Sequence, residues 1–454
     1  MLNLVKSGEL KIMNMQESVE YLSEIAGKSG AEQFDILAGN QDSRDISVFN
    51  GALQNTEISN SCGIGIRIFK NQKPGYASTE KFSKESLSQT LADALSNCEY
   101  TESMNIDLPE PVAVNGALPT YNPELESVDV NHLLNTCLSI EKLILAESEI
   151  KNVPDLGAEI LSSTTIFANS KGIFFEDKRN QFGIGAGAVA ERNGVVKMGW
   201  YGKGGRDFGM VFAEQISKEV VSRARELLSP KPIKSGKIPI ILSKRISANI
   251  LSIYLPSFYA ENAQKGLSRL KECLGDKIAN EKFSLSSEPL RPDLPGSVLM
   301  DSEGIPTAAL SIVENGQFES FLYNLESASK ENRKSTGHGV RGFSGKAATS
   351  FINAVVSLGE LSGKEILSIF PKCILINHLE GTSGCNSVSG EISIGAQGFW
   401  CENGVPLHAA DNLTISANFF DLLKNIVGIG SEYNDSFSSV KVPSLAISEM
   451  AVSV

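Results

Sequence analysis

The side chains that most often hold a metal ion, histidine and cysteine, are few and scattered in this chain. No two of its four histidines lie three to five residues apart, and none of its seven cysteines forms a Cys-x-x-Cys pair. A zinc site ordinarily uses one of these spacings on a single element. The residues themselves therefore give little support to a metal site. The histidines are His132, His338, His378 and His408, and the cysteines are Cys62, Cys98, Cys137, Cys273, Cys373, Cys385 and Cys401.

The nearest approach to a ligand cluster is His378 with Glu380 and Cys385. An ordinary loop explains that irregular spacing more readily than a metal site does. Ser335 and Ser344 flank His338 and suggest a nucleophile and a base, but no acid in the sequence is placed to orient the base. The Gly-x-Ser-x-Gly elbow of many serine hydrolases is absent. The residues alone show no catalytic constellation.

Two glycine-rich stretches invite a nucleotide-binding interpretation. Residues 340–346, VRGFSGK, resemble the end of a phosphate loop, but Val340 occupies the first glycine position and Ala347 stands where Ser or Thr would hold magnesium. The run Gly183–Gly187 alternates as a strand does and does not open a helix, so it is not a dinucleotide fingerprint. A nucleotide-linked role of the first loop is the weakest alternative. Thermal stabilisation by nucleotides would test it.

Composition limits the partners. With 454 residues, 41% apolar and 21% charged, the chain is long enough for two or three ordinary globular domains. A net charge of -12 disfavours general binding to nucleic acid or to anionic membranes. The scattered cysteines predict reduced thiols and a cytoplasmic protein. No signal peptide is recognisable, and no apolar run reaches the ~20 residues of a membrane span.

The hydrophobic periodicity predicts an α+β fold. A helix, an antiparallel meander and a second helix follow one another twice, over residues 16–98 and 130–229. Residues 1–232 are therefore predicted to form an N-terminal α+β domain with an internal repeat. The predicted strands of the two meanders are short, at 35–38, 45–49, 54–58 and 63–69 in the first, and at 158–167, 172–177, 182–190 and 195–201 in the second.

Residues 233–454 are predicted to form a mostly-β C-terminal domain with a few helices. Asn315-Gly316 and Asn403-Gly404 each stand between two apolar runs, which is a strong signal for a type I′ hairpin. The first hairpin, with strands at 305–313 and 318–323, leads through a polar helix-like segment to a glycine-rich loop that contains His338 and Arg341. Further helices are predicted at 247–271, with an interruption at Pro256, and at 419–427.

The chain resembles the TldD/PmbA family, peptidase-type proteins also described as modulators of DNA gyrase, and is more similar to the PmbA (TldE) branch. The blocks that carry the resemblance keep the family's order and spacing over nearly the whole chain. They are Asn60–Gly65, Asp301–Thr307 (DSEGIPT), Glu314–Gly316, Lys334–Gly337, Val340–Gly342, Asn386–Gly390 (NSVSG), Gly398–Trp400, Glu402–Gly404, Asn425–Val427 and Pro443–Leu445.

This resemblance implies where a zinc site would lie. In the TldD branch a helix with His-Glu-x-x-x-His and a cysteine near the C-terminus hold zinc. The helix motif falls here on Ser252, Ile253 and Ser257, and residues 436–444 contain no cysteine. The degenerate positions imply a chain without catalytic residues and without a metal of its own. Zinc is expected in a TldD-type partner.

The resulting hypothesis is a non-catalytic subunit of a zinc metallopeptidase complex. It would form a heterodimer with a TldD-type paralogue, or a homodimer, and help to admit a peptide or an unfolded protein to the complex. His338 and Arg341 are the candidate residues for contact with the peptide or the partner. The alternative is a homodimeric module that binds peptides or proteins and takes part in no chemistry.

Overall fold

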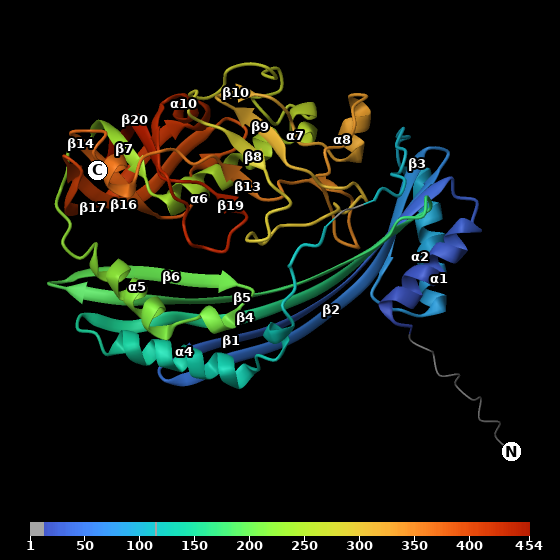
Figure 1. Ribbon diagram of the computed structural model, residues 1–454, viewed down its shortest axis with the longest axis horizontal. Helices are drawn as coiled ribbons and strands as arrows, with labels where there is room; N and C mark the ends of the chain where they lie inside the picture. Colours follow the sequence, from blue (N-terminus) through green and yellow to red (C-terminus); the bar gives the residue numbers. More distant parts are fainter. Residues whose placement is uncertain (1–12, 114–115) are drawn as a thin grey trace.

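The computed structural model describes residues 13–113 and 116–454. The fold is mixed α and β, as predicted, and its N-terminal half is one long, curved antiparallel sheet with the strand order β3-β2-β1-β4-β5-β6 (Figure 1). β1 and β4 meet antiparallel at the centre, so each half of the sheet comes from one helix–meander–helix segment. The strands are β1 (Gln33–Phe49), β2 (Ala52–Lys70), β3 (Lys73–Thr79), β4 (Ile150–Asn169), β5 (Phe174–Arg192) and β6 (Val195–Gly205).

The strands are longer than the sequence pattern predicted. The predicted strands at 35–38 and 45–49 are both parts of β1, and those at 54–58 and 63–69 are parts of β2. The predicted strands at 172–177 and 182–190 both fall in β5, which begins at Phe174. The prediction ended each strand where polar residues break the alternation. Backbone pairing continues through those residues because a ladder hydrogen bond does not require an apolar side chain.

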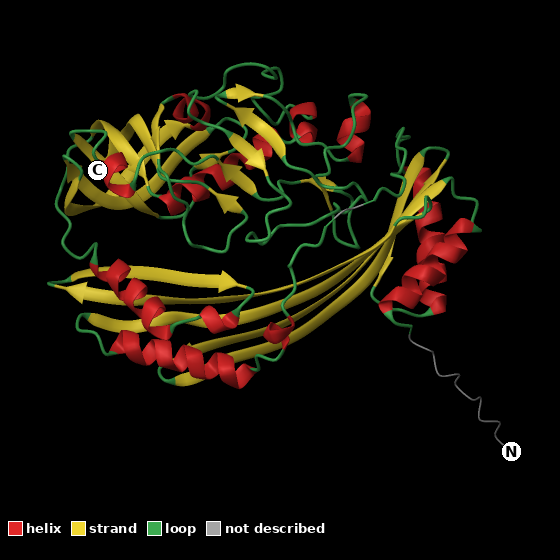
Figure 2. Cartoon of the chain, in the orientation of Figure 1, coloured by secondary structure: helices red, strands yellow, loops and turns green. Residues whose placement is uncertain are grey.

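Helices cover the convex face of this sheet (Figure 2). The helices α1 (Met15–Gly27) and α2 (Lys84–Asn97) pack on the half formed by β1–β3, and α4 (Val130–Leu145) and α5 (Ala213–Arg225) pack on the other half. Ser83 is the N-cap of α2, because its side chain accepts the amide of Ser86. Three short pieces complete this half: η1 (Cys98–Tyr100), α3 (Pro123–Glu126) and η2 (Phe208–Met210).

The C-terminal half lies on the concave side of the long sheet (Figure 1). A seven-stranded sheet has the order β14-β7-β20-β17-β16-β15 with β18 paired to β20, and a five-stranded sheet has the order β10-β9-β8-β13-β19. β11 pairs with β12 separately. The strands are β7 (Gly236–Leu242), β8 (Leu285–Ser287), β9 (Leu310–Glu314), β10 (Gln317–Phe318), β11 (Gly339–Val340), β12 (Ala348–Thr349), β13 (Ala354–Val356), β14 (Lys372–Leu379), β15 (Cys385–Asn386), β16 (Glu391–Glu402), β17 (Val405–Asn418), β18 (Ile426–Ile429), β19 (Val440–Lys441) and β20 (Leu445–Ser453).

Both Asn-Gly hairpins form. Asn315 and Gly316 have φ values of 48° and 83°, and Asn403 and Gly404 have 49° and 80°, as a type I′ turn requires. The first hairpin is shorter than predicted, because only β9 and the two-residue β10 pair. The polar helix-like segment predicted after this hairpin forms the helix α8 (Leu325–Lys330).

Two predicted helices end early. The segment 247–271 contains most of α6 (Lys244–Tyr254), then a 3-10 turn η3 (Leu255–Phe258) with Pro256 as its second residue, and α7 (Ala260–Gln264). Proline cannot continue the helical hydrogen bonds, which explains the break. The helix predicted at 419–427 is α10 (Phe419–Lys424), and its last residues belong to β18, which pairs with β20. The helix α9 (Gly363–Leu367) was not predicted. Of the helices in residues 13–113 and 116–454, none is long and apolar enough to cross a membrane.

Candidate functional site

The positions that correspond to the family's zinc helix lie on α6 and η3. Ser252 is exposed and its hydroxyl donates to the carbonyl of Ala248 at 2.7 Å, while Ile253 packs against the main C-terminal core. Ser257 is buried, and its hydroxyl donates to the carbonyl of Ser387 at 3.1 Å. Two serine hydroxyls engaged with backbone carbonyls and an alkyl side chain do not make a zinc-binding set, so the residues present do not fit the ion.

Other candidate ligands do not converge either. His378 lies opposite Gln397 on β16, whereas Cys385 lies opposite Ile392, five residues further along, or roughly 16 Å. The last cysteine, Cys401, is buried opposite Cys373 in the β14–β16 ladder. Within the part of the chain that the structure describes, no three His, Cys, Asp or Glu side chains group closely enough to hold a metal.

A buried network of charges joins the long sheet to the C-terminal half. The guanidinium of Arg67, on β2, donates from Nε to Oδ2 of Asp35 at 2.9 Å and from Nη1 to Oε1 of Glu303 at 2.8 Å. Arg341 donates from Nη2 to Oδ1 of Asp35 at 2.5 Å. All four side chains are at most 2% exposed. Two carboxylates and two guanidiniums thus neutralise one another inside the molecule.

The turn Asp301–Gly304 positions Glu303 for this network. One carboxylate oxygen of Asp301 accepts the amides of Glu303 and Ile305, each at 2.9 Å, and the other accepts the amide of Gly339 at 2.8 Å. Burial, with a contribution from Glu303, raises the pKa of Asp301 to about 7. The turn Asp301–Gly304 therefore holds the glycine-rich loop through the amide of Gly339 and directs the side chain of Glu303 towards Arg67.

His338 and Arg341, predicted to contact a peptide or a partner, both point into the chain. His338 is fully buried, with Nε2 at 2.8 Å from the hydroxyl of Ser287 and Nδ1 at 2.8 Å from the carbonyl of Thr336. Arg341 is held by Asp35. The geometry gives both residues a structural role, and the binding role stays a prediction.

The burial of His338 predicts a specific pH dependence of stability. Burial lowers its pKa to about 4, whereas an unfolded histidine titrates near pH ~6.5. Between these values the unfolded chain binds a proton at this site that the folded chain does not. The contribution of His338 to stability therefore falls as the pH falls through this window, by about 1.4 kcal/mol per pH unit, while the raised pKa of Asp301 contributes in the opposite direction. We expect His338→Gln to weaken that slope in denaturant unfolding, and the half-buried control His408→Gln to retain it. Equal slopes in wild type and His338→Gln would contradict this assignment.

The loop of residues 340–346 docks on a notch made by glycines of the long sheet. The ring of Phe343 lies where a Cβ of Gly63 would be, 2.3 Å from that position, and its carbonyl oxygen lies 1.7 Å from the position of a Cβ on Gly65. The loop then continues into β12, not into a helix. A phosphate loop opens a helix, so the structure does not support the nucleotide-binding interpretation.

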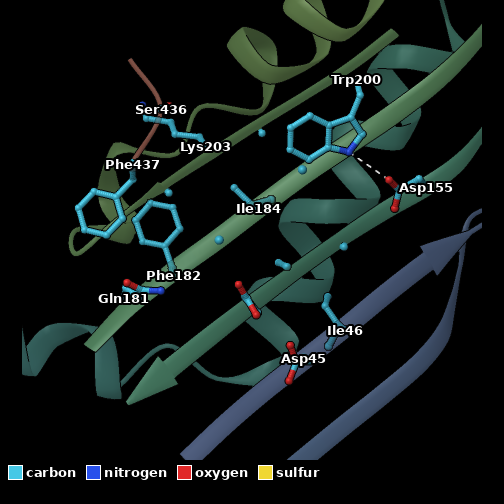
Figure 3. A pocket seen from close by; sticks show the side chains of 17 residues that line it. Asp45, Ile46, Asp155, Gln181, Phe182, Ile184, Trp200, Lys203, Ser436 and Phe437 are labelled. Atoms are coloured by element: carbon cyan, nitrogen blue, oxygen red, sulfur yellow. Dashed lines mark hydrogen bonds between the residues drawn. The ribbon is translucent and has the colours of Figure 1, made fainter. Parts of the chain in front are cut away.

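The other half of the sheet has a corresponding notch, and there it is a cavity of about 500 Å³ (Figure 3). Gly157, Gly183 and Gly185 form its floor, as Gly39, Gly63 and Gly65 do in the first notch. Gly183–Gly187 lies within β5, as predicted. Ser436 and Phe437, from the loop before β19, close one end. The loop in which the family's cysteine was sought therefore reaches the sheet at this cavity, and α6 packs beside β19.

Comparisons with known proteins agree with the fold. A structure from Thermotoga maritima, described as a modulator of a DNA gyrase, superposes with a TM-score of 0.90 at 27% identity and covers 97% of this chain and 100% of its own. TldE from Thermococcus kodakarensis superposes with a TM-score of 0.85 at 21% identity, covering 96% and 100%. The fold is thus that of a class of two-part α+β proteins with solved representatives in bacteria and archaea.

The chain belongs to the PmbA/TldD metallopeptidase family. The family models described as PmbA/TldA metallopeptidase domain 1, central domain and C-terminal domain match residues 34–98, 123–228 and 235–454. The chain is 24% identical over 452 residues to the metalloprotease PmbA homologue of Haemophilus influenzae, covering 97% of this chain and 96% of the relative. It is 24% identical over 450 residues to the metalloprotease PmbA of Escherichia coli O157:H7, covering 96% of each.

Sequence reasoning missed the residues that join the two halves and those that line the cavity. Asp35, Arg67 and Phe343 stood in unremarkable positions, because their partners are more than thirty, and in places more than two hundred, residues away. Both meanders contain a Gly-Ile-Gly segment, at Gly63–Gly65 and at Gly183–Gly185. These segments were the available signal for two notches, since glycine in a strand often marks close approach of another group.

Proposed function

We propose that this chain is a non-catalytic, PmbA/TldE-type subunit of a zinc metallopeptidase complex that acts on peptides or unfolded proteins. The observation that carries the proposal is the set Ser252, Ile253 and Ser257, which stands where the family's metal helix is expected and cannot bind zinc. The rest of the family fold is retained. A zinc-bearing TldD-type chain would supply the ion, and the complex would work in the cytoplasm.

Peptide hydrolysis of this type needs an ion that polarises the carbonyl and lowers the pKa of a bound water. No residue of α6 or of the 436–444 loop can bind such an ion here. The contribution that remains is binding, through the concave face of the long sheet and the loops of the C-terminal half that face it. The net charge of -12 does not favour direct contact with DNA.

The first test is metal content and partner recovery. We expect the purified chain to contain far less than one zinc per chain and to cleave no peptide by itself. From its own cytoplasm it should recover a paralogue with the His-Glu-x-x-x-His motif, and the pair should cleave peptides. Glu→Gln in the partner's motif is the matched control and should abolish cleavage without loss of the pair.

Two results would overturn the proposal. Stoichiometric zinc in this chain alone, or cleavage by it alone, would show that it has a metal site of its own. Recovery of only a second copy or of a non-peptidase protein would favour the alternative, a binding module that takes part in no chemistry.

A further inference from the structure

The two glycine notches on the concave face are filled differently. Gly39 lies opposite Gly63 in the β1–β2 ladder, and Gly157 lies opposite Gly185 in the β4–β5 ladder. The first notch receives Phe343 from the C-terminal half. The second is the cavity described above. Phe437 of the C-terminal half lines it beside Gly204, but no side chain of that half covers Gly157, Gly183 or Gly185. The sheet thus offers a second seat of the same construction, open to an incoming group.

Carboxylates line the open notch. Asp45 lies directly opposite Glu159 on β4 and opposite Glu57 on β2, so three acidic side chains stand in one row across the sheet. Burial and the charge of Asp45 raise the pKa of Glu159. Like charges placed directly opposite each other destabilise a sheet. A bound cation would neutralise this row.

No basic side chain of the lining neutralises the row. Among the lining residues that the structure describes, Lys203 alone is basic, and its Nζ donates to the carbonyl of Met210 at 2.6 Å and lies 5.7 Å from the ring of Phe212. Gly202 and Gly204, its neighbours in β6, face the cavity, so Lys203 points to the opposite face of the sheet. Arg206 lies over the ring of Phe437 and donates to backbone carbonyls of Thr120, Pro292 and Leu294.

An exposed aromatic side chain completes the notch. Trp200 is 46% exposed, and its Nε1 donates to Oδ2 of Asp155 at 3.0 Å (Figure 3). Its ring passes over the positions where Gly185 and Gly202 would carry a Cβ, so the glycines let the indole lie on the sheet. Val196 and Met198 precede it at every second position of β6, so they lie on the same face of the sheet, and they are also exposed. Exposed apolar side chains in a row mark a binding surface more often than chance exposure does.

We propose that this notch binds a basic side chain, lysine or arginine, of an extended peptide, with its charge between Asp45 and Glu159 and its alkyl part on Trp200. Val196 and Met198 then take an apolar residue of the same peptide. Carboxylates give charge-assisted hydrogen bonds to the cation, and the alkyl stem of a lysine or arginine packs on apolar surface such as the indole. This inference rests on the proposed function and names its substrate class: peptides in which basic and apolar residues stand close together.

The test uses the fluorescence of Trp200 in the full chain. Trp200 and Trp400 are the two tryptophans, and Trp400→Phe makes Trp200 the sole reporter. The probe is a pentapeptide, blocked at both ends, in which arginine stands between two leucines. Its matched control has citrulline in place of the arginine, which keeps the shape of the side chain and removes its charge. We expect saturable quenching by the arginine peptide that weakens with added salt, and binding of the citrulline peptide at least about tenfold weaker.

Variants decide whether the carboxylates are responsible. Asp45→Asn with Glu159→Gln should weaken arginine-peptide binding at least about tenfold, and should unfold no earlier than wild type, because it relieves like-charge repulsion. Glu176→Gln removes an exposed charge from β5 away from the cavity and should leave binding unchanged. Equal affinity for both peptides, unaltered affinity in the double variant, or absence of quenching would each overturn the site. The titration contains no partner and no cleavage, so these results leave the subunit proposal to its own test.

Discussion

Arg67→Met is expected to lower the free energy of unfolding by about 3–5 kcal/mol, because it leaves two buried carboxylates without their shared cation. Asp35 and Glu303 are fully buried, and Arg67 donates to both. Arg341 still neutralises Asp35, but among the residues that the structure describes Glu303 keeps only the amide of Leu325 as a partner. Methionine fills a similar volume, so the expected loss comes from charge and not from a cavity.

Denaturant unfolding, followed by the midpoint of the transition, measures this loss. Lys28→Met breaks an exposed pair with Glu24 and should leave the midpoint unchanged, since surface pairs contribute little. Glu303→Gln should lower the free energy of unfolding less in the Arg67→Met background than in the wild type. The reason is that glutamine still accepts the hydrogen bond from the Leu325 amide and needs no cation. Additive costs of the two substitutions would contradict the network.

The network also has a consequence for the arrangement of the halves. Asp35 and Arg67 belong to the long sheet, whereas Glu303 and Arg341 belong to the C-terminal half, 236 residues apart for the Arg67–Glu303 pair. Arg67→Met should therefore loosen the C-terminal half from the sheet before either half unfolds. Proteolysis of the connection between α5 and β7 should then be faster in Arg67→Met than in the wild type, which would indicate this separation.

Local rules found most of the elements. The four helices on the long sheet and both Asn-Gly turns follow from side chains within a few residues of one another, so the sequence pattern was sufficient to predict them. Strand length was predicted less well, because pairing through polar stretches such as Gly39–Arg44 depends on a neighbouring strand and not on local alternation. Helix α10 was extended too far for the same reason, since Ile426 pairs with Ile447 of β20.

The roles of the candidate site residues also depend on contacts that local sequence does not contain. The positions Ser252, Ile253 and Ser257 could be located only through a family resemblance, since nothing in their own types points to metal chemistry. His338 and Arg341 were noticed because they lie in a glycine-rich loop, and loops commonly carry binding residues. Their burial depends on Ser287 and Asp35, which approach from distant strands. No local pattern could show that.

Gly65→Ala is the second substitution with a large expected effect. A Cβ there would lie 1.7 Å from the carbonyl oxygen of Phe343, which is backbone and cannot turn aside. The loop would have to leave the notch, and its departure would move Arg341 away from Asp35. We expect a loss of about 3 kcal/mol in the free energy of unfolding, the upper part of the usual range for overpacking.

The sheet supplies its own control in the second notch. A Cβ on Gly185 would lie 2.7 Å from Cζ2 of Trp200, an exposed side chain that can rotate away. Gly185→Ala should therefore change stability by no more than about 0.5 kcal/mol, while weakening peptide binding because the indole is displaced. Gly65 and Gly185 are each the second glycine of a Gly-Ile-Gly segment in their strand, so the contrast compares what occupies each notch. Equal loss of stability in both variants would mean that the second notch, like the first, is part of the folded core and not a seat for a ligand.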